Sequence, residues 1–230
     1  MKTYAQYCPI ARTSEILAQR WTPIIIRNLL DGPASYSSLA DRAPGIPRSL
    51  LTSRLRELQS AELVEKKARP EGSGTFYELT EPGQDLATVI TAMGNWGERW
   101  LEVTPQQADP IYFLNSWINT YLNKDALPDH RVVARFEFSD QPPKISPMWV
   151  IFDRNDPEVC RSDPGYPEDL IINGESVALA EWHLGRTEWS DAITSGRITI
   201  HGIPKLTNAL PTWNNRSRWT TAIHPQTSRT

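Results

Sequence analysis

The sequence predicts an α+β protein of two domains, residues 1–104 and 105–230. Two observations support this division. Apolar residues of the first part recur mainly at helical spacing, whereas the second part contains short runs in which apolar and polar residues alternate, as in strands. Twelve of the 19 prolines follow Thr104, which suits many short elements joined by sharp turns. The segment PQQADP after Thr104 is the predicted linker.

Length, charge and cysteine content are those of a globular protein. The chain has 230 residues and a net charge of −3, and it is long enough to bury one or two cores. Its longest apolar run, around residues 24–26, is far too short to span a bilayer. The N-terminal residues lack the apolar core of a secretory signal. Cys8 and Cys160 are far apart in the sequence, which argues against a disulfide framework. We therefore expect a cytoplasmic protein.

Three successive helices are expected in the first domain. The first begins at Thr22 and is stopped by the sequence DGP, and the second contains YSSLADR. The third begins at Pro47, and its Leu51, Leu55 and Leu58 are spaced as one apolar stripe.

A hairpin and a further helix complete the first domain. LVEKKAR and TFYELT are strand-like runs separated by a polar loop. The helix after them extends from Pro82 to Leu101. Its apolar residues are Leu86, Val89, Ile90, Met93, Trp96, Trp100 and Leu101. This apolar surface exceeds the need of a small three-helix core, which predicts either a dimer contact or packing against the second domain.

Three helices followed by a two-stranded ribbon is the element order of a winged helix-turn-helix. In that fold the third helix enters the DNA major groove and the hairpin contacts the backbone. With the leucine stripe turned inward, the other face of the third helix is polar and points outward, where it can bond base edges and phosphates. The predicted DNA-binding residues of this helix and of the hairpin are Arg48, Ser49, Thr52, Ser53, Arg56, Lys66, Lys67 and Arg69.

The charge of this region supports a polyanion partner. From Arg20 to Arg69 the sequence has nine basic and five acidic residues, a local excess of +4, although a solvated face also has such runs. We therefore expect double-stranded DNA as the partner. Phosphate contacts from the hairpin give affinity and salt dependence but little sequence discrimination.

A series of motifs at fixed spacings runs from Cys8 to Leu101: CP, RW, LL before G, YSSL, GI, LLTSRLRELQSAELVEKK, YELTEPGQDL and NWGERW. The series resembles the HxlR family of bacterial winged-helix transcriptional regulators. The resemblance implies a homodimer joined by the N-terminal segment and the helix after the wing. Such a dimer is expected to bind a pseudo-palindromic operator, with repression as the expected effect. Two positions depart from the family pattern, since Gln19-Arg20 stands where Gly-Lys is common and Ala61-Glu62 replaces Ala-Gly.

Cys8 is a candidate redox sensor. In Cys8-Pro9 the proline suits the first helical position, which leaves the thiol at a helix N-terminus, where reactive cysteines occur. Some members of the HxlR family sense oxidants or electrophiles through a cysteine in this region. A buried cysteine that only packs is the alternative.

The second domain mixes helices and strands. The expected order is a helix at 111–122, strands in RVVARFEFSD, MWVIFD, EVCRS and DLIIN, helices in SVALAEWHLG and EWSDAI, a strand in RITIHG, and a short helix near 205–210.

Several turns and strands of the second domain form a second recognisable pattern. FEF, WVIF, DPG, DLII, SGRI and IHG, between residues 108 and 213, resemble the sterol-carrier-protein-like domain. The resemblance implies a twisted sheet, covered by helices, around an apolar tunnel that binds lipids or other hydrophobic molecules. The expected pocket residues are Trp117, Phe136, Phe138, Trp149, Ile151, Trp182 and Trp189. Aromatic residues at these spacings also simply fill cores.

The sequence contains no recognisable catalytic or metal-binding motif, so we expect no enzyme, cofactor or metal. The predicted function is a dimeric DNA-binding regulator whose second domain senses a hydrophobic small molecule. The alternative is a protein that binds or transfers lipids and uses its N-terminal half for dimerisation.

Overall fold

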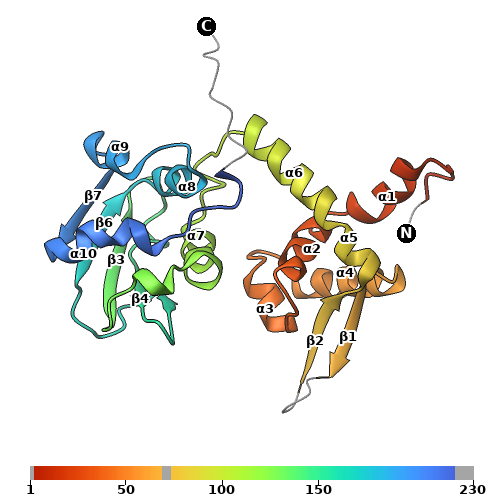
Figure 1. The fold of residues 1–230 in the computed structure, drawn as a ribbon, viewed down its shortest axis with the longest axis horizontal. Helices are drawn as coiled ribbons and strands as arrows, with labels where there is room; N and C mark the ends of the chain where they lie inside the picture. Colours follow the sequence, from red (N-terminus) through yellow and green to blue (C-terminus); the bar gives the residue numbers. More distant parts are fainter. Residues whose placement is uncertain (1–2, 69–73, 221–230) are drawn as a thin grey trace, which may run out of the picture. The chain divides into compact units, whose positions relative to one another are not determined.

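The computed structural model describes residues 3–68 and 74–220. The chain divides into two compact units, Met1–Gly94 and Asn95–Thr230, and the boundary lies within helix α6 (Ala87–Trp100) (Figure 1). Among the described residues, no helix has the length and apolar content that crossing a membrane requires.

The first unit has the predicted order of helices and strands. Its helices are α1 (Pro9–Leu17), α2 (Thr22–Leu30), α3 (Tyr36–Asp41), α4 (Arg48–Ser60), α5 (Glu81–Asp85) and the first part of α6; its strands are β1 (Val64–Ala68) and β2 (Thr75–Leu79). The two strands pair in antiparallel register. Ala34, just before α3, exchanges two backbone hydrogen bonds with Tyr77 of β2, at 3.0 and 2.8 Å. This bridge fixes the hairpin to the helical part of the unit.

One apolar core fixes the orientation of α4. Leu51, Leu55 and Leu58 are at most 1% exposed, and they belong to one cluster with Ile25 and Ile26 of α2. Burial of each such side chain contributes about 1.5–3 kcal/mol. The predicted leucine stripe is confirmed, and the polar face of α4 is therefore turned outward.

The helix expected from Pro82 to Leu101 is divided into α5 and α6. Thr80 caps α5, because its hydroxyl accepts a hydrogen bond from the Gly83 amide at 3.2 Å. The amide of Leu86 donates to the carbonyl of Gly83, a tight i to i−3 bond that ends the short helix. A Cβ atom at Gly83 would lie 2.1 Å from the carbonyl oxygen of Leu63, so glycine allows α5 to pack directly on the residue before β1.

Glu62 has a left-handed backbone conformation, with φ 57°. Glycine adopts this conformation at little steric cost, which gives a physical reason for the glycine that is common here in the family pattern. A side chain raises the cost by about 1–2 kcal/mol. The hydroxyl of Thr80 donates to the Glu62 carbonyl at 2.6 Å, and this bond helps to hold the turn.

The second unit is an α+β unit, as predicted. Its helical elements are α7 (Pro110–Ser116), the π-helical turn η1 (Trp117–Tyr121), η2 (Lys124–Ala126), α8 (Ser176–Leu184), α9 (Trp189–Thr194), α10 (Pro204–Ala209) and η3 (Leu210–Trp213). Its strands are β3 (Val132–Phe138), β4 (Met148–Phe152), β5 (Glu158–Cys160), β6 (Leu170–Gly174) and β7 (Ile198–Gly202). The sheet order is β5-β4-β3-β6-β7. Only the central pair β3 and β6 is parallel among these neighbours.

The helices of the second unit pack on one face of this sheet. Alternate residues of each strand, such as Phe136 and Phe138 of β3, enter a cluster with residues of α7, η1, α8, α9, α10 and η3. Trp117 lies at its centre. Its ring contacts those of Phe136 and Trp182, with centroids 6.2 and 5.5 Å away, and it is 1% exposed.

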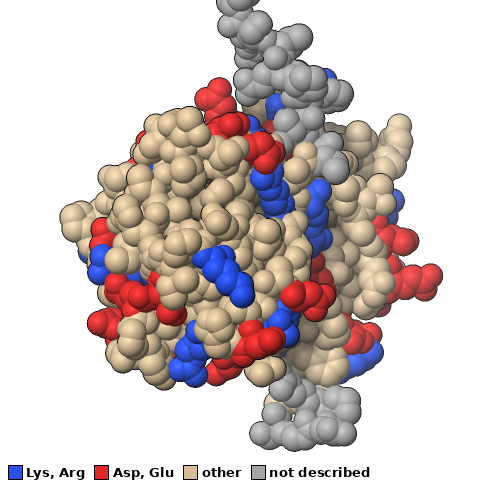
Figure 2. Space-filling view, turned by 60° about the vertical axis from the view of Figure 1, so that its left-hand side comes forward, with Lys and Arg blue, Asp and Glu red and all other residues tan. Residues whose placement is uncertain are grey.

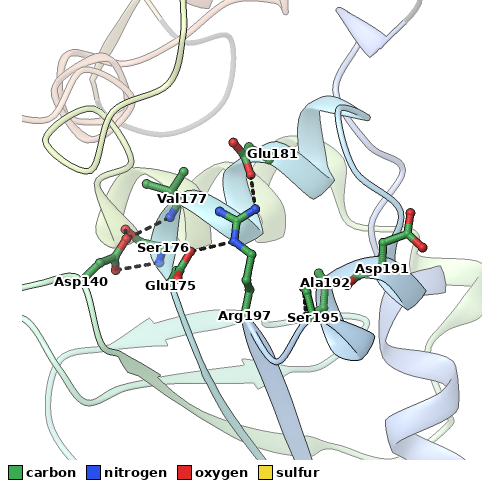
Figure 3. Close-up of polar contacts among 9 residues, drawn as sticks. All are labelled: Asp140, Glu175, Ser176, Val177, Glu181, Asp191, Ala192, Ser195 and Arg197. Carbon is green, nitrogen blue, oxygen red and sulfur yellow. Dashed lines mark hydrogen bonds and ion pairs between the residues drawn. The ribbon is translucent and has the colours of Figure 1, made fainter.

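Polar contacts fix α8 at its N-terminal end (Figure 3). The carboxylate of Asp140 accepts hydrogen bonds from the Ser176 amide at 2.7 Å and from the Val177 amide at 3.2 Å. A carboxylate at this place satisfies free amides and complements the helix dipole. Arg197, next to β7, bonds Glu175 at 2.8 Å and Glu181 at 2.6 Å. These contacts hold α8 against the edge of the sheet.

His183 is buried near the C-terminal end of α8. Its Nδ1 lies 3.0 Å from Oδ1 of Asn214, and its ring makes edge contacts with Tyr121 and Phe113 at 4.6 and 5.8 Å. Burial lowers the pKa of His183 to about 4, and the neighbouring Arg216 also lowers it, while the bond to Asn214 opposes the shift. The imidazole is therefore neutral at physiological pH.

This shift predicts a loss of stability in mild acid. The folded-state pKa, about 4, lies below the ordinary value of 6.5, so unfolding takes up a proton between these pH values. The contribution is complete above pH 6.5 and falls as the pH drops toward 4. Unfolding by urea at pH 7.5 and pH 5 should show a decrease of about 2 kcal/mol in the free energy of unfolding of the second unit. The variant His183→Gln, which keeps a donor for Asn214, should lose most of this decrease. An equal pH dependence in both proteins would contradict the assignment.

Candidate nucleic-acid interface

The outward face of α4 carries exposed cations at the start and in the middle of the helix. Arg48, Ser49 and Arg56 are exposed, whereas Thr52 and Ser53 are partly buried. All five lie off the buried leucine stripe, as the sequence predicted. The structure places them on one helix without testing what they bind, so their role in DNA binding stays a prediction.

Tyr36 of α3 holds the first turn of α4. Its hydroxyl donates to the carbonyl of Arg48 at 2.8 Å and lies 3.3 Å from Oγ1 of Thr52. The Thr52 hydroxyl donates to the same carbonyl at 3.0 Å. Because the carbonyl accepts two bonds, the first turn of α4 is fixed relative to α3. The sequence analysis missed this role of Tyr36. The only sign of it in the sequence was the small number of residues between α3 and α4.

Glu57 lies on the outward face of α4, where its negative charge would repel a phosphate, but neighbouring side chains partly neutralise it. Its carboxylate accepts hydrogen bonds from Arg54 at 2.6 Å and from Ser53 at 3.1 Å. Arg54 also donates to the carbonyl of Arg20 at 3.1 Å, so it connects α4 to the segment before α2. Arg54 was not among the predicted site residues, and its role here is internal: it neutralises the carboxylate on the outward face.

The wing cations differ in their surroundings. Lys66 is exposed, and its ammonium lies 5.7 Å from the ring centroid of Tyr77. Lys67 pairs with Glu65 at 2.8 Å and also with Glu78 of β2. These two hydrogen bonds raise the pKa of Lys67, and the bond to Lys67 lowers the pKa of Glu65. Lys67 is thus compensated by two carboxylates. Arg69, the third predicted wing cation, lies outside the described residues.

An apolar groove separates α1 from the first part of α6. It has a volume of about 410 Å³ and is lined by Pro9, Ile10, Thr13, Ser14, Leu17, Ala18, Val89 and Met93. Ile10 is 77% exposed and Met93 49%. Cys8 is the N-cap residue of α1 and is partly buried. Its redox sensing stays a prediction.

The predicted pocket residues of the second unit fall into two groups. Trp117, Phe136, Phe138 and Trp182 are buried in the core cluster, and Trp189 packs against it. Trp149 and Ile151 belong to the opposite face of the sheet, because their neighbours Met148, Val150 and Phe152 point into the cluster. The indole of Trp149 donates to Glu168 at 2.9 Å there. The seven residues therefore do not line one space.

Charge on the second unit is mixed. On the face that Figure 2 brings forward, basic and acidic side chains are scattered around a wide uncharged area. The described residues contain no group of three or more His, Cys, Asp or Glu side chains placed to hold a metal ion. On this face the second unit offers no continuous cationic surface.

The outward polar helix α4 and the adjoining hairpin define the first unit as a winged helix-turn-helix. Comparisons with known proteins identify the same class of protein. A family model described as HxlR-like helix-turn-helix matches residues 16–105. The HTH-type transcriptional regulator YodB of Bacillus subtilis is 34% identical over 97 residues, which cover 41% of this chain and 87% of YodB. An uncharacterized HTH-type transcriptional regulator of Synechocystis is 32% identical over 96 residues, which cover 41% of this chain and 71% of the relative. A solved structure of reduced YodB covers 42% of this chain and 97% of its own, with 33% identity and a TM-score of 0.38.

The chain belongs to the HxlR-like helix-turn-helix family. The family model covers the first unit from residue 16 onward and the rest of α6.

Proposed function

We propose that this protein is a bacterial transcriptional regulator that binds a pseudo-palindromic operator as a homodimer, with repression as the effect. One observation carries the proposal: α4 buries its leucines and turns Arg48, Ser49 and Arg56 outward beside a hairpin. Membership of the HxlR-like family supports the same reading, since the named relatives are HTH-type transcriptional regulators.

The exposed residues divide into two roles. Arg56 and Ser49 lie on α4, where side chains can reach base edges in the major groove. Arg48, in the first turn of α4, and Lys66 of the wing suit phosphate contacts, which orient the protein without reading sequence. Specificity therefore depends on α4 and affinity on both elements.

Replacement of Arg56 tests whether the protein reads sequence. Selection of DNA fragments from a random pool at about 150 mM salt, where non-specific binding is weakened, should enrich an inverted repeat. Arg56→Ala should weaken binding to that repeat by about tenfold or more, because a bidentate base contact is worth about 1–3 kcal/mol.

Arg161→Ala, which removes an exposed arginine of the second unit, is the matched control and should leave operator affinity unchanged. If the pool yields no enriched sequence, the proposal of an operator fails for the unliganded protein. The favoured function would then be that of the lipid-binding or transfer protein.

The carboxylates around Lys67 should limit DNA affinity. The double variant Glu65→Gln, Glu78→Gln removes both partners of Lys67 and leaves its charge free for a phosphate. We expect tighter binding at low salt and a slope of log K against log salt that is steeper by about 1. Glu102→Gln, an exposed change in the second unit, is the control. An unchanged slope would show that the wing does not contact the DNA backbone.

We propose that the groove between α1 and α6 accepts a second copy of this chain. Ile10, Val89 and Met93 line it and are exposed. The N-terminal segment also exposes Tyr4 and Tyr7, and the last turns of α6 expose Trp96 and Trp100. A monomeric protein rarely exposes so many large apolar side chains. Burial of these side chains in an interface removes their contact with water.

A charge in the groove should separate the subunits. The chain mass is 26.1 kDa, so the wild-type protein should have twice this mass by light scattering. Met93→Glu should give the mass of a single chain and weaken operator binding, because a monomer contacts one half-site. Gln84→Glu, on α5 outside the groove, should remain dimeric. A wild-type monomer at micromolar concentration would overturn the dimer.

We propose that the second unit is a sterol-carrier-like domain that senses a hydrophobic molecule. Its five-stranded sheet, covered on one face by helices, and its aromatic core support this proposal. A contact within the unit offers a route to α6. Arg186, two residues after α8, donates to the Glu98 carboxylate at 2.5 Å and to the carbonyls of Glu98 and Leu101 at 2.9 and 2.8 Å. A ligand that shifts α8 would therefore move the end of the proposed dimer helix, which is coupling by differential binding.

A further inference from the structure

Among its described residues, the second unit contains three buried side-chain hydrogen-bond donors of tryptophan and asparagine that have no partner. In the part of the chain that the structure describes, the buried side-chain atoms without a partner are Trp182 Nε1, Trp213 Nε1, Asn214 Nδ2 and Arg135 Nε. Arg135 is on the other face of the sheet and pairs with Glu137 and Glu168 through its other nitrogens. We call Trp182, Trp213 and Asn214 the donor cluster.

Direct contacts join the members of the donor cluster. The ring of Trp182 lies 5.5 Å from that of Trp117, and Trp117 Nε1 donates to the carbonyl of Trp213 at 2.9 Å. Asn214 follows Trp213 and bonds His183, the neighbour of Trp182, at 3.0 Å. Together with the peptide links between Trp182 and His183 and between Trp213 and Asn214, these contacts connect five residues, the fifth of which is Trp117. Trp182, Trp213 and Asn214 thus belong to one connected part of the core.

A native core rarely leaves such groups unpaired. Each buried donor without an acceptor destabilises the folded state, because it has lost its hydrogen bond to water without replacement, and both tryptophans are completely buried. All three free atoms are N–H donors, and no side-chain oxygen in the described residues shares their condition. A molecule that supplies only acceptor oxygens matches this pattern better than water does, because water also brings two hydrogens that need acceptors.

The charges around the donor cluster favour an uncharged molecule. The guanidinium of Arg216 lies 5.9 Å from the ring centroid of Trp182, but it is already paired with both carboxylate oxygens of Glu188, at 3.2 and 2.7 Å. His183 is neutral at physiological pH, as described above. A carboxylate would therefore lose its hydration without gaining a free cation, and this costs far more than burial of a neutral carbonyl.

The surroundings of the donor cluster are aromatic and locally irregular. Trp213 contacts Phe152 with ring centroids 5.1 Å apart, and Trp182 contacts Trp189 at 4.8 Å. Offset and edge contacts of this kind suit an aromatic guest. The π-helical turn η1 begins at Trp117 and ends at Tyr121. Such turns are rare in proteins overall, and those that occur are often found at functional sites.

We propose that Trp182, Trp213 and Asn214 bind an uncharged aromatic molecule through a carbonyl or ether oxygen. The inference rests on the proposed ligand-binding role of the second unit and names the chemical class of the ligand. The donor cluster is closed to solvent, so the molecule binds a minor, locally opened conformation and stabilises it. This site differs from the apolar groove of the first unit, which contains no cluster of unpaired donors among its lining residues.

Benzophenone and diphenylmethane form a matched pair of probes for this site. They have the same two rings, but only benzophenone carries an acceptor oxygen. Equilibrium dialysis against the full-length protein should show that benzophenone binds about tenfold more tightly, as expected for one or two net hydrogen bonds. Equal affinities of the two probes would overturn the proposal, and so would no binding of benzophenone up to its solubility limit.

Replacement of the tryptophan donors should reduce this preference. In the variants Trp182→Phe and Trp213→Phe the ratio of the two affinities should fall about twofold each, and in the double variant, which keeps the Asn214 amide, it should be about two. Trp189→Phe, which changes a neighbouring ring whose nitrogen is not among the unpaired atoms, should keep the ratio. Because the ratio compares two probes on the same protein, a general loosening of the core does not imitate the effect. An undiminished ratio of about ten in the double variant would contradict the assignment.

Light-induced labelling locates the bound benzophenone. The excited ketone takes a hydrogen atom from a nearby C–H bond, and the two resulting radicals combine into a C–C bond, which turns the ketone into an alcohol. Peptides that contain residues 113–121, 182–189 or 213–217 should carry the label. A label confined to α1 or to residues 89–93 would place the probe in the groove of the first unit and overturn the site.

Measurement of operator affinity with and without benzophenone tests the binding site and the proposed sensing function separately. Donor-dependent binding that changes operator affinity supports both the site and sensing. Donor-dependent binding without any change in operator affinity supports the site and contradicts sensing by the second unit.

Discussion

The burial of the α4 leucines is the constraint on which the rest of the first unit depends. Leu51, Leu55 and Leu58 must leave water, and they occupy one side of a helix. Once they pack against α2, the opposite side of α4 is exposed and carries Arg48, Ser49 and Arg56. The polar outward face of α4 is therefore a consequence of the core. Tyr36 adds precision, because its bond to the Arg48 carbonyl fixes the first turn of the helix.

Charge pairing within the unit decides how much of its basic excess can act on a partner. Arg54 neutralises Glu57 on the outward face of α4, and Glu65 and Glu78 compensate Lys67 on the wing. The pairing of Glu57 reduces its repulsion of a phosphate, and the pairing of Lys67 reduces its attraction for a phosphate. Pairs of exposed charges contribute little to stability, so the effect of these pairs is mainly on the field that an approaching phosphate meets.

In the second unit, α8 connects three features that would otherwise be separate. Its N-terminal end is held by Asp140, its last turn contains Trp182 and His183, and Arg186 beyond it bonds the end of α6. A rigid helix with fixed contacts at both ends transmits a displacement from one to the other. Trp182 of the donor cluster belongs to this helix, so a molecule bound there, as proposed, would act on the helix whose extension bonds α6.

The sequence by itself determined the order of elements, the leucine stripe, the wing and the α+β character of the second unit, because helix and strand periodicity and turn residues are local signals. It also predicted that α4 buries its leucines and turns Arg48, Ser49 and Arg56 outward. Only the tertiary structure decided which polar groups keep their partners. Lys67 meets Glu78 through strand register, and Trp149 and Ile151 face away from the other predicted pocket residues through β alternation. Trp182 and Trp213 both contact Trp117, which is distant from them in the sequence. Such pairings arise from packing over long sequence separations, which no local pattern encodes.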